Sequence, residues 1–225
     1  MRPRPQVDFY LYASHEIPTW LPIVRALTAR GVDARFVLAE TELRPTVLGL
    51  IATGRMRPDT GEVRLWEVAG TAHADVTQVG PAATQLGCLA PINDGQQAYV
   101  LRSALSHLDA WTRTGIAPPR APRLDTPSGA DGKPTFHLDA NGNVTGGIRT
   151  PSVDAPMQVL SGLPVEGSSI VCVLMGSTRP LAAERVKALY PDPGDYEKAY
   201  ALAADHAIEA GFILPADRSK LLGET

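Results

Sequence analysis

Residues 7–75 alternate between strand-like and helix-like segments, and this alternation restricts the possible folds more than any other feature of the sequence. The strand-like segments are 7–13, 34–40 and 62–70, and the helix-like segments are 19–31 and 45–54. The first strand has a β-branched and aromatic composition, and the first helix has apolar residues at helical spacing and ends at Gly31. Strands that alternate with helices predict an α/β domain with a mostly parallel sheet.

The rest of the chain is richer in helices and loops. A helix is expected over 94–114, with Asn93 or Asp94 as its N-cap. A Pro/Gly-rich loop follows and carries a hairpin signal at Asn141-Gly142. The apolar run SIVCVLMG (169–176) is expected as a strand. The helices expected after it are 180–190, begun by Ser177 or Thr178 as cap, 195–210, and 215–222 with Pro215 at its start.

The composition is that of a globular protein and excludes several classes. The apolar fraction is 44% and the net charge is only −3, with no basic stripe, so we expect no nucleic-acid partner. No segment reaches the roughly 20 apolar residues of a transmembrane helix. No signal peptide is recognisable, so the cytoplasm is the default expectation although the compartment stays open. Cys88 and Cys172 form no metal-binding spacing, and the sequence leaves open whether they are free thiols or a disulfide.

His73 is the first candidate catalytic residue. It lies among small residues just after the strand-like segment 62–70. Loops that follow the strands of parallel sheets carry functional residues, and a histidine after a strand is where α/β-hydrolases place their general base. The alternative is a structural or surface histidine. The same alternative is favoured for the three histidines within expected elements. His107 and His206 lie in expected helices, and His137 lies in the expected hairpin.

The acid that would orient His73 has three candidates. Glu40 and Glu42 follow the strand 34–40, at the sheet end where ligand-facing residues gather. Glu42 is favoured because it lies further past the strand. Asp75 is only two residues from His73, and we expect it to bond to the loop backbone instead.

No G-x-S-x-G nucleophile motif occurs in the sequence. Ser177, in MGSTRP, lacks the glycine two positions later, and helix capping explains it better than nucleophilic catalysis. The glycine-containing stretches lack the context of phosphate-binding loops. We therefore expect no cofactor and no metal.

From VLAETEL to its end the chain resembles the C-terminal portion of a bacterial family of "alpha/beta hydrolase domain" proteins. The matching stretches include RLWEVAGTAHAD, PINDGQQAYVLRSALSHLDAWTRTGIAPPRAPRL, GNVTGGIRTPSVDAP, CVLMGSTRP, LYPDPGDY and AGFILPAD. Residues 1–35 match poorly. The resemblance implies that His73 is the base of a catalytic triad and that Glu42 stands where the family has an aspartate.

The resemblance implies a single, incomplete α/β-hydrolase domain over residues 1–225. Its parts are an N-terminal β-α segment (1–35), strands that bear the acid and the histidine (36–92), and a helix, an extended loop with a hairpin, and C-terminal helices (93–225). The parent protein is expected to be a serine-dependent carboxylic ester hydrolase acting on a small-molecule ester. This chain lacks the nucleophile motif, so we expect it to be truncated and inactive alone.

Two other functions remain open. The chain could be a non-catalytic binding domain on a hydrolase scaffold. Alternatively, 17–38 is similar to the first β-α-β unit of some glycosyltransferases, which would indicate an N-terminal fusion. A sheet that lacks its first strands exposes an edge, so self-association through that edge is also expected.

Overall fold

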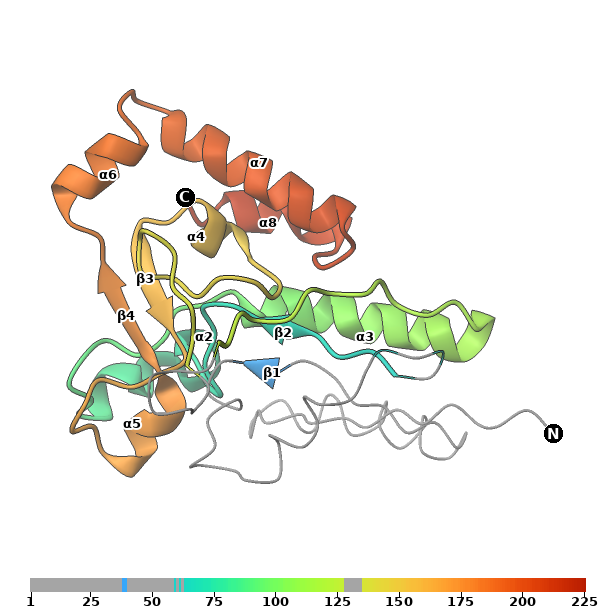
Figure 1. Cartoon of the computed structure of the whole chain (residues 1–225), viewed down its shortest axis with the longest axis horizontal. Coiled ribbons are helices and arrows are strands. Elements are labelled where there is room, and N and C mark those ends of the chain that lie inside the picture. Colours follow the sequence, from blue (N-terminus) through green and yellow to red (C-terminus); the bar gives the residue numbers. More distant parts are fainter. Residues whose placement is uncertain (1–37, 40–58, 60, 62, 128–134) are drawn as a thin grey trace.

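The computed structural model describes residues 38–39, 59, 61, 63–127 and 135–225 (Figure 1). Glu40, Glu42 and most of segment 1–62 lie outside the described residues. The described strands are β1 (Leu38–Ala39), β2 (Glu67–Val68), β3 (Gln158–Ser161) and β4 (Ser177–Pro180). The described helices are α2 (Val76–Val79), η2 (Gly80–Gln85), α3 (Gln97–Thr114), α4 (Pro151–Asp154), α5 (Ile170–Met175), α6 (Ala183–Leu189), α7 (Asp195–Glu209), η3 (Pro215–Asp217) and α8 (Arg218–Leu222).

Strands β1 and β2 pair in parallel, with Leu38 opposite Glu67. A further parallel bridge joins Val68 to Ile148. The strands expected over 34–40 and 62–70 are thus confirmed in their described parts, although each is only two residues long there. Together with the helices they make an α/β fold.

Strands β3 and β4 form an antiparallel pair, and here the sequence-based prediction is wrong in two places. The run 169–176 is not a strand but contains helix α5, because the Ser169 side chain accepts a hydrogen bond from the backbone N–H of Cys172 and caps it. Ser177 and Thr178 do not cap a helix either. They begin β4, and the next helix, α6, starts only at Ala183.

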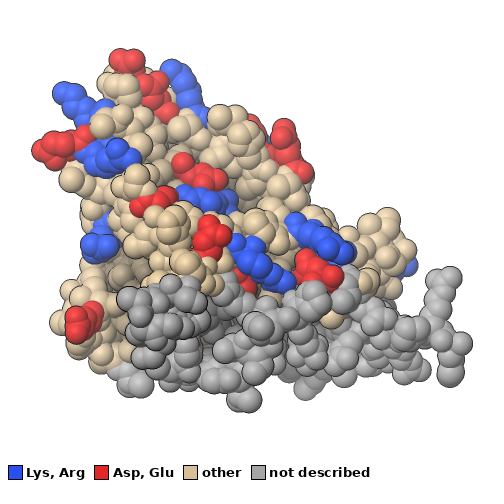
Figure 2. All heavy atoms as spheres, in the orientation of Figure 1, with Lys and Arg blue, Asp and Glu red and all other residues tan. Residues whose placement is uncertain are grey.

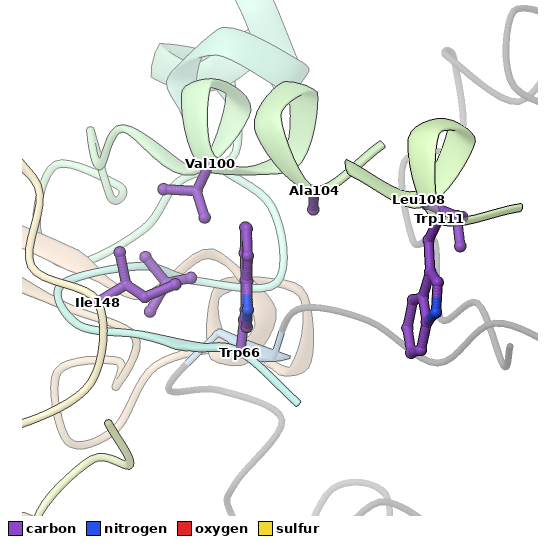
Figure 3. Packing of buried hydrophobic residues seen from close by; sticks show 7 residues of the cluster. Trp66, Val100, Ala104, Leu108, Trp111 and Ile148 are labelled. Atoms are coloured by element: carbon purple, nitrogen blue, oxygen red, sulfur yellow. The ribbon is translucent and has the colours of Figure 1, made fainter. Parts of the chain in front are cut away.

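Helix α3 packs its apolar side against β2, and this contact is the centre of the core (Figure 3). The indole of Trp66 points toward α3 between Val100 and Ala104, and it is fully buried. Its Nε1 donates a hydrogen bond to Pro119 O at 2.9 Å. The predicted helix 94–114 is therefore confirmed, including its end at Gly115, whose φ of 77° is left-handed.

The C-terminal helices cover the other side of α3 (Figure 1). Tyr99 of α3 packs with Tyr200 and Ala204 of α7 and with Leu221 of α8. The helices expected over 195–210 and 215–222 are confirmed, the second as a 3-10 turn that continues into α8.

In its described residues, 115–127 and 135–150, the loop between α3 and α4 contains turns and isolated β-bridges but no helix. Its hairpin signal is confirmed as a single antiparallel bridge between Leu138 and Val144 rather than as paired strands. The Gly142 N–H donates to Asp139 O at 3.0 Å and closes the turn. Arg149 fixes this turn with an ion pair to Asp139 at 2.8 Å.

The charged side chains on the face drawn in Figure 2 alternate in sign, and neither sign forms a broad patch. In the described ranges, no helix is long and apolar enough to cross a membrane.

Candidate active-site loop

His73 lies on a short loop between β2 and α2, and it is half-buried. The loop begins with a turn at Ala69 and Gly70, where the Thr71 hydroxyl donates to Val68 O at 2.8 Å. Thr71 and Ala72 are fully buried, so the two residues that precede His73 are packed in the protein interior. The imidazole is thus partly accessible, on a loop whose preceding residues are anchored in the core.

Asn93 holds this loop from the next segment of the chain and is completely buried. Its Nδ2 donates to Gly70 O at 3.1 Å and to Ser161 O at 3.0 Å, while its Oδ1 accepts from Gly95 N at 2.8 Å. Asn93 or Asp94 was expected as the N-cap of α3, but that position belongs to Gln96, which makes no side-chain cap. Asn93 therefore satisfies buried backbone groups on both sides of the loop instead of starting a helix.

Two glycines allow other parts of the chain to pack closely at the loop. A Cβ at Gly70, whose φ is 69°, would come within 2.6 Å of Val153 Cγ2. A Cβ at Gly176, whose φ is 59°, would lie 2.3 Å from Ser161 O and 2.9 Å from Ala72 Cβ. Both positions need a residue without a side chain, for conformation and for space.

Asp75 ends the loop as the N-cap of α2, so it bonds to backbone as expected, although this backbone belongs to the helix that follows the loop. Its carboxylate accepts from Gln78 N at 3.0 Å, and the Gln78 side chain accepts from Asp75 N at 3.1 Å, which together form a capping box. Asp75 is thus engaged with the helix that follows.

A disulfide supports the helix that lies against the loop. Cys88 and Cys172 are bonded, which answers the question that the sequence left open. Cys172 is in α5, and from the same helix Leu174 O accepts the backbone N–H of Ala74 at 3.2 Å. Met175 O accepts Asn93 N at 2.8 Å. The disulfide, α5, Asn93 and the histidine loop therefore form one connected unit.

Both candidate acids, Glu42 and Glu40, lie outside the described residues. The pairing of either with His73 therefore stays a prediction. Within the described residues, β1 pairs in parallel with β2, the strand that precedes the His73 loop.

The other residues considered for chemistry have structural contacts. Ser177 is buried and its hydroxyl donates to Leu163 O at 3.0 Å. His107 Nε2 lies 2.9 Å from Gly211 O, and its ring lies edge-on to Trp66. His137 Nδ1 lies 2.9 Å from the Thr145 hydroxyl, and His206 is exposed in α7.

The sequence did not reveal Asn93 or the buried Glu67 as important residues. Glu67 is fully buried in β2, and its Oε2 accepts from Leu124 N at 2.8 Å. Each of these side chains bonds to residues distant in the chain, which no local pattern indicates. Among the described residues, no group of three or more histidine, cysteine, aspartate or glutamate side chains could hold a metal ion.

Comparison with known proteins bears on the family of the chain. No curated protein and no solved structure matches the chain. A family model described as "Alpha/beta hydrolase domain" matches residues 12–223. The match begins within segment 1–35, where little resemblance was expected, and it runs through the histidine loop and the C-terminal helices. The chain therefore belongs to the alpha/beta hydrolase domain family.

Proposed function

We propose that this chain supplies the general base and the orienting acid of a serine hydrolase that cleaves carboxylic esters. The observation that carries the proposal is the fixed position of His73 directly after β2, in a chain that the family model matches over residues 12–223. In this mechanism His73 takes the proton from the attacking serine and returns it to the leaving alcohol. Glu42 accepts the other imidazole N–H and holds the tautomer.

The supports of the loop favour this role for His73. A general base must stay within hydrogen-bond distance of its nucleophile, so small displacements are costly. Asn93, Ala74 and Val76 bond the loop to separate segments, with Val76 N donating to Asn93 O at 2.9 Å. A surface histidine with no function would not need such support.

The nucleophile does not come from a G-x-S-x-G motif within these 225 residues. We therefore expect no acyl-enzyme on this chain by itself. A fluorophosphonate probe tests this directly: the isolated chain stays unlabelled, whereas an extended polypeptide that joins this chain to a segment with such a motif is labelled at the serine of that motif. Labelling of the isolated chain at Ser177 would overturn the assignment.

Variants of the extended, labelled protein separate the roles of the residues. His73→Asn is expected to lower kcat by roughly 10⁴-fold or more, because the serine loses its base. The matched control is His206→Asn, on the exposed side of α7, which should leave kcat within twofold. Glu42→Gln should also cost roughly 10⁴-fold, and Glu40→Gln less than tenfold. The reverse order for the two glutamates would assign the acid to Glu40.

A further inference from the structure

A cavity of about 590 Å³ lies where the start of α3 meets α4, α7 and α8. Its aromatic walls come from Tyr99 of α3 and from Tyr196 and Tyr200 of α7. Figure 1 shows the end of the chain beside α4 and α8, at the same place. This volume is in the range of small-molecule sites. The three rings lie among mostly polar side chains, which include Arg102, Lys220 and Glu224. His73 is not among the lining residues.

The cavity has two buried hydrogen-bond donors that bind one carboxylate. Gln96 and Tyr99 are 5% and 4% exposed. Gln96 Nε2 donates to Glu224 Oε2 at 2.7 Å, and the Tyr99 hydroxyl donates to Glu224 Oε1. The two donors thus hold both oxygens of a single carboxylate, while the residue that carries it, Glu224, is itself exposed.

The orientation of the Gln96 amide is fixed by the fold. Its Oε1 accepts the backbone N–H of Ser152 at 3.1 Å, so its Nε2 has to face the cavity. The same Nε2 lies 2.5 Å from the Tyr200 hydroxyl, which is fully buried. The Gln96 donor is therefore preorganised and does not depend on Glu224 for its position.

Positive charge lies next to this pair of donors. Lys220 Nζ is 5.8 Å from the centroid of the Tyr99 ring, and the Arg102 guanidinium is 4.5 Å from it. Arg102 Nε is bound to Asp217 at 3.0 Å, but its buried Nη2 finds no hydrogen-bond partner in the described part of the chain. A buried guanidinium N–H without an acceptor is unfavourable, and an anionic ligand in the cavity would supply one.

We propose that this cavity binds a small molecule with a carboxylate group, which replaces the Glu224 carboxylate on Gln96 and Tyr99. The chemistry favours a singly charged anion. Two neutral donors match the two oxygens of a carboxylate, and Asp94 at the cavity wall would repel a second negative charge. The tyrosine rings accommodate an apolar body. This proposal does not rest on the hydrolase chemistry of His73.

Benzoate, with benzamide as its neutral analogue, tests the proposal by calorimetric titration of the full chain. Glu224→Gln removes the competing intramolecular carboxylate, so benzoate should bind this variant at least tenfold more tightly than the unmodified chain. Benzamide should bind both equally and more weakly. Glu209→Gln, an exposed glutamate at the end of α7, is the matched control and should leave benzoate affinity unchanged.

A second substitution tests the pair of hydrogen-bond donors, Gln96 and Tyr99, directly. Tyr99→Phe, added to Glu224→Gln, keeps the ring and removes one donor, so benzoate affinity should fall at least fivefold while benzamide is unaffected. If the variants fail to fold by circular dichroism, saturable shifts of the Gln96 side-chain amide on adding benzoate to the unmodified chain carry the test. Absence of those shifts, or equal affinity for benzoate and benzamide, would overturn the proposal. Tighter binding of benzylammonium to the unmodified chain than to Glu224→Gln would overturn it in favour of a cationic ligand.

Discussion

Among single residues, Asn93 connects the histidine loop to two distant segments. Replacing it with alanine leaves the carbonyls of Gly70 and Ser161 without their side-chain donor and Gly95 N–H without its acceptor. Because Asn93 is fully buried, water cannot take over these bonds, and we expect the free energy of unfolding to fall by about 3 kcal/mol in urea titration.

Asn141→Ala is the matched control for this change. The Asn141 side chain accepts one exposed hydrogen bond from Arg185 at 2.7 Å, so its loss should cost less than about 1 kcal/mol. Equal losses of unfolding free energy in the two variants would show that the buried hydrogen bonds of Asn93 stabilise the fold no more than the exposed one of Asn141.

Asp94 gives a prediction about pH at the same scale. Burial, and then the nearby Glu224 carboxylate, raise the pKa of Asp94 above its usual 3.8. The folded chain thus binds this proton more tightly than the unfolded chain. The contribution of Asp94 to stability is therefore present at low pH and is lost as pH rises through the raised pKa.

Glu224→Gln removes the like charge but not the burial of Asp94. We expect the pKa of Asp94 to move down toward 3.8 without reaching it, as followed by the carboxyl ¹³C shift in an NMR titration. Glu209→Gln serves again as the control. An unchanged Asp94 pKa in Glu224→Gln would mean that the charge of Glu224 does not affect the ionisation of Asp94.

At the scale of elements, the packing of α3 against β2 forms the centre of the hydrophobic core. Leu108 of α3 is 1% exposed in the cluster with Trp66, whereas Leu202 of α7 is 58% exposed. The same Leu→Ala change should therefore cost about 3 kcal/mol at Leu108 and less than about 0.5 kcal/mol at Leu202. Urea titration measures both, and similar losses would contradict a core centred on this contact.

The elements that could be predicted from the sequence are those with strong local signals. Helix α3 has a long apolar stripe and ends at Gly115, and α7 starts at Asp195 and stops before Gly211. The run 169–176 has no such signal, since six apolar residues suit a strand or a buried helix equally. Its cap Ser169 and its disulfide decide the outcome, and the second of these depends on a residue 84 positions away.

The candidate site, too, could be predicted only where its features are local in the sequence. The position of His73 after a strand is a local feature, and the structure places it on the loop after β2. The partners of Asn93 are 23 and 68 residues away in the chain, so its role could not be read from its neighbours. The N-cap predicted at Asn93 or Asp94 was wrong because the helix begins only at Gln97, and the side chain of Asn93 makes tertiary hydrogen bonds instead of a local cap.

For the whole molecule, the Cys88–Cys172 disulfide closes a loop with a sequence separation of 84 that contains α3, the extended loop and β3. A cross-link of this span restricts the unfolded chain, and the chain-entropy estimate of its contribution is about 4 to 5 kcal/mol. The double variant Cys88→Ala/Cys172→Ala should therefore melt roughly 10 °C lower or more by calorimetry under oxidising conditions.

A reducing agent provides the control for this prediction. It should lower the melting temperature of the unmodified chain to that of the double variant and leave the double variant unchanged. Hydrogen exchange then shows whether the effect is also local, because Ala74 N and Asn93 N donate to Leu174 O and Met175 O of the bonded helix α5. Faster exchange at these two amides than at Gly115 N, which donates to Trp111 O at the end of α3, would mean that the disulfide holds the histidine loop in the native state. Equal acceleration of exchange at all of these amides would mean that the disulfide acts only on the unfolded chain. An unchanged melting temperature would contradict both a local and a global effect of the disulfide.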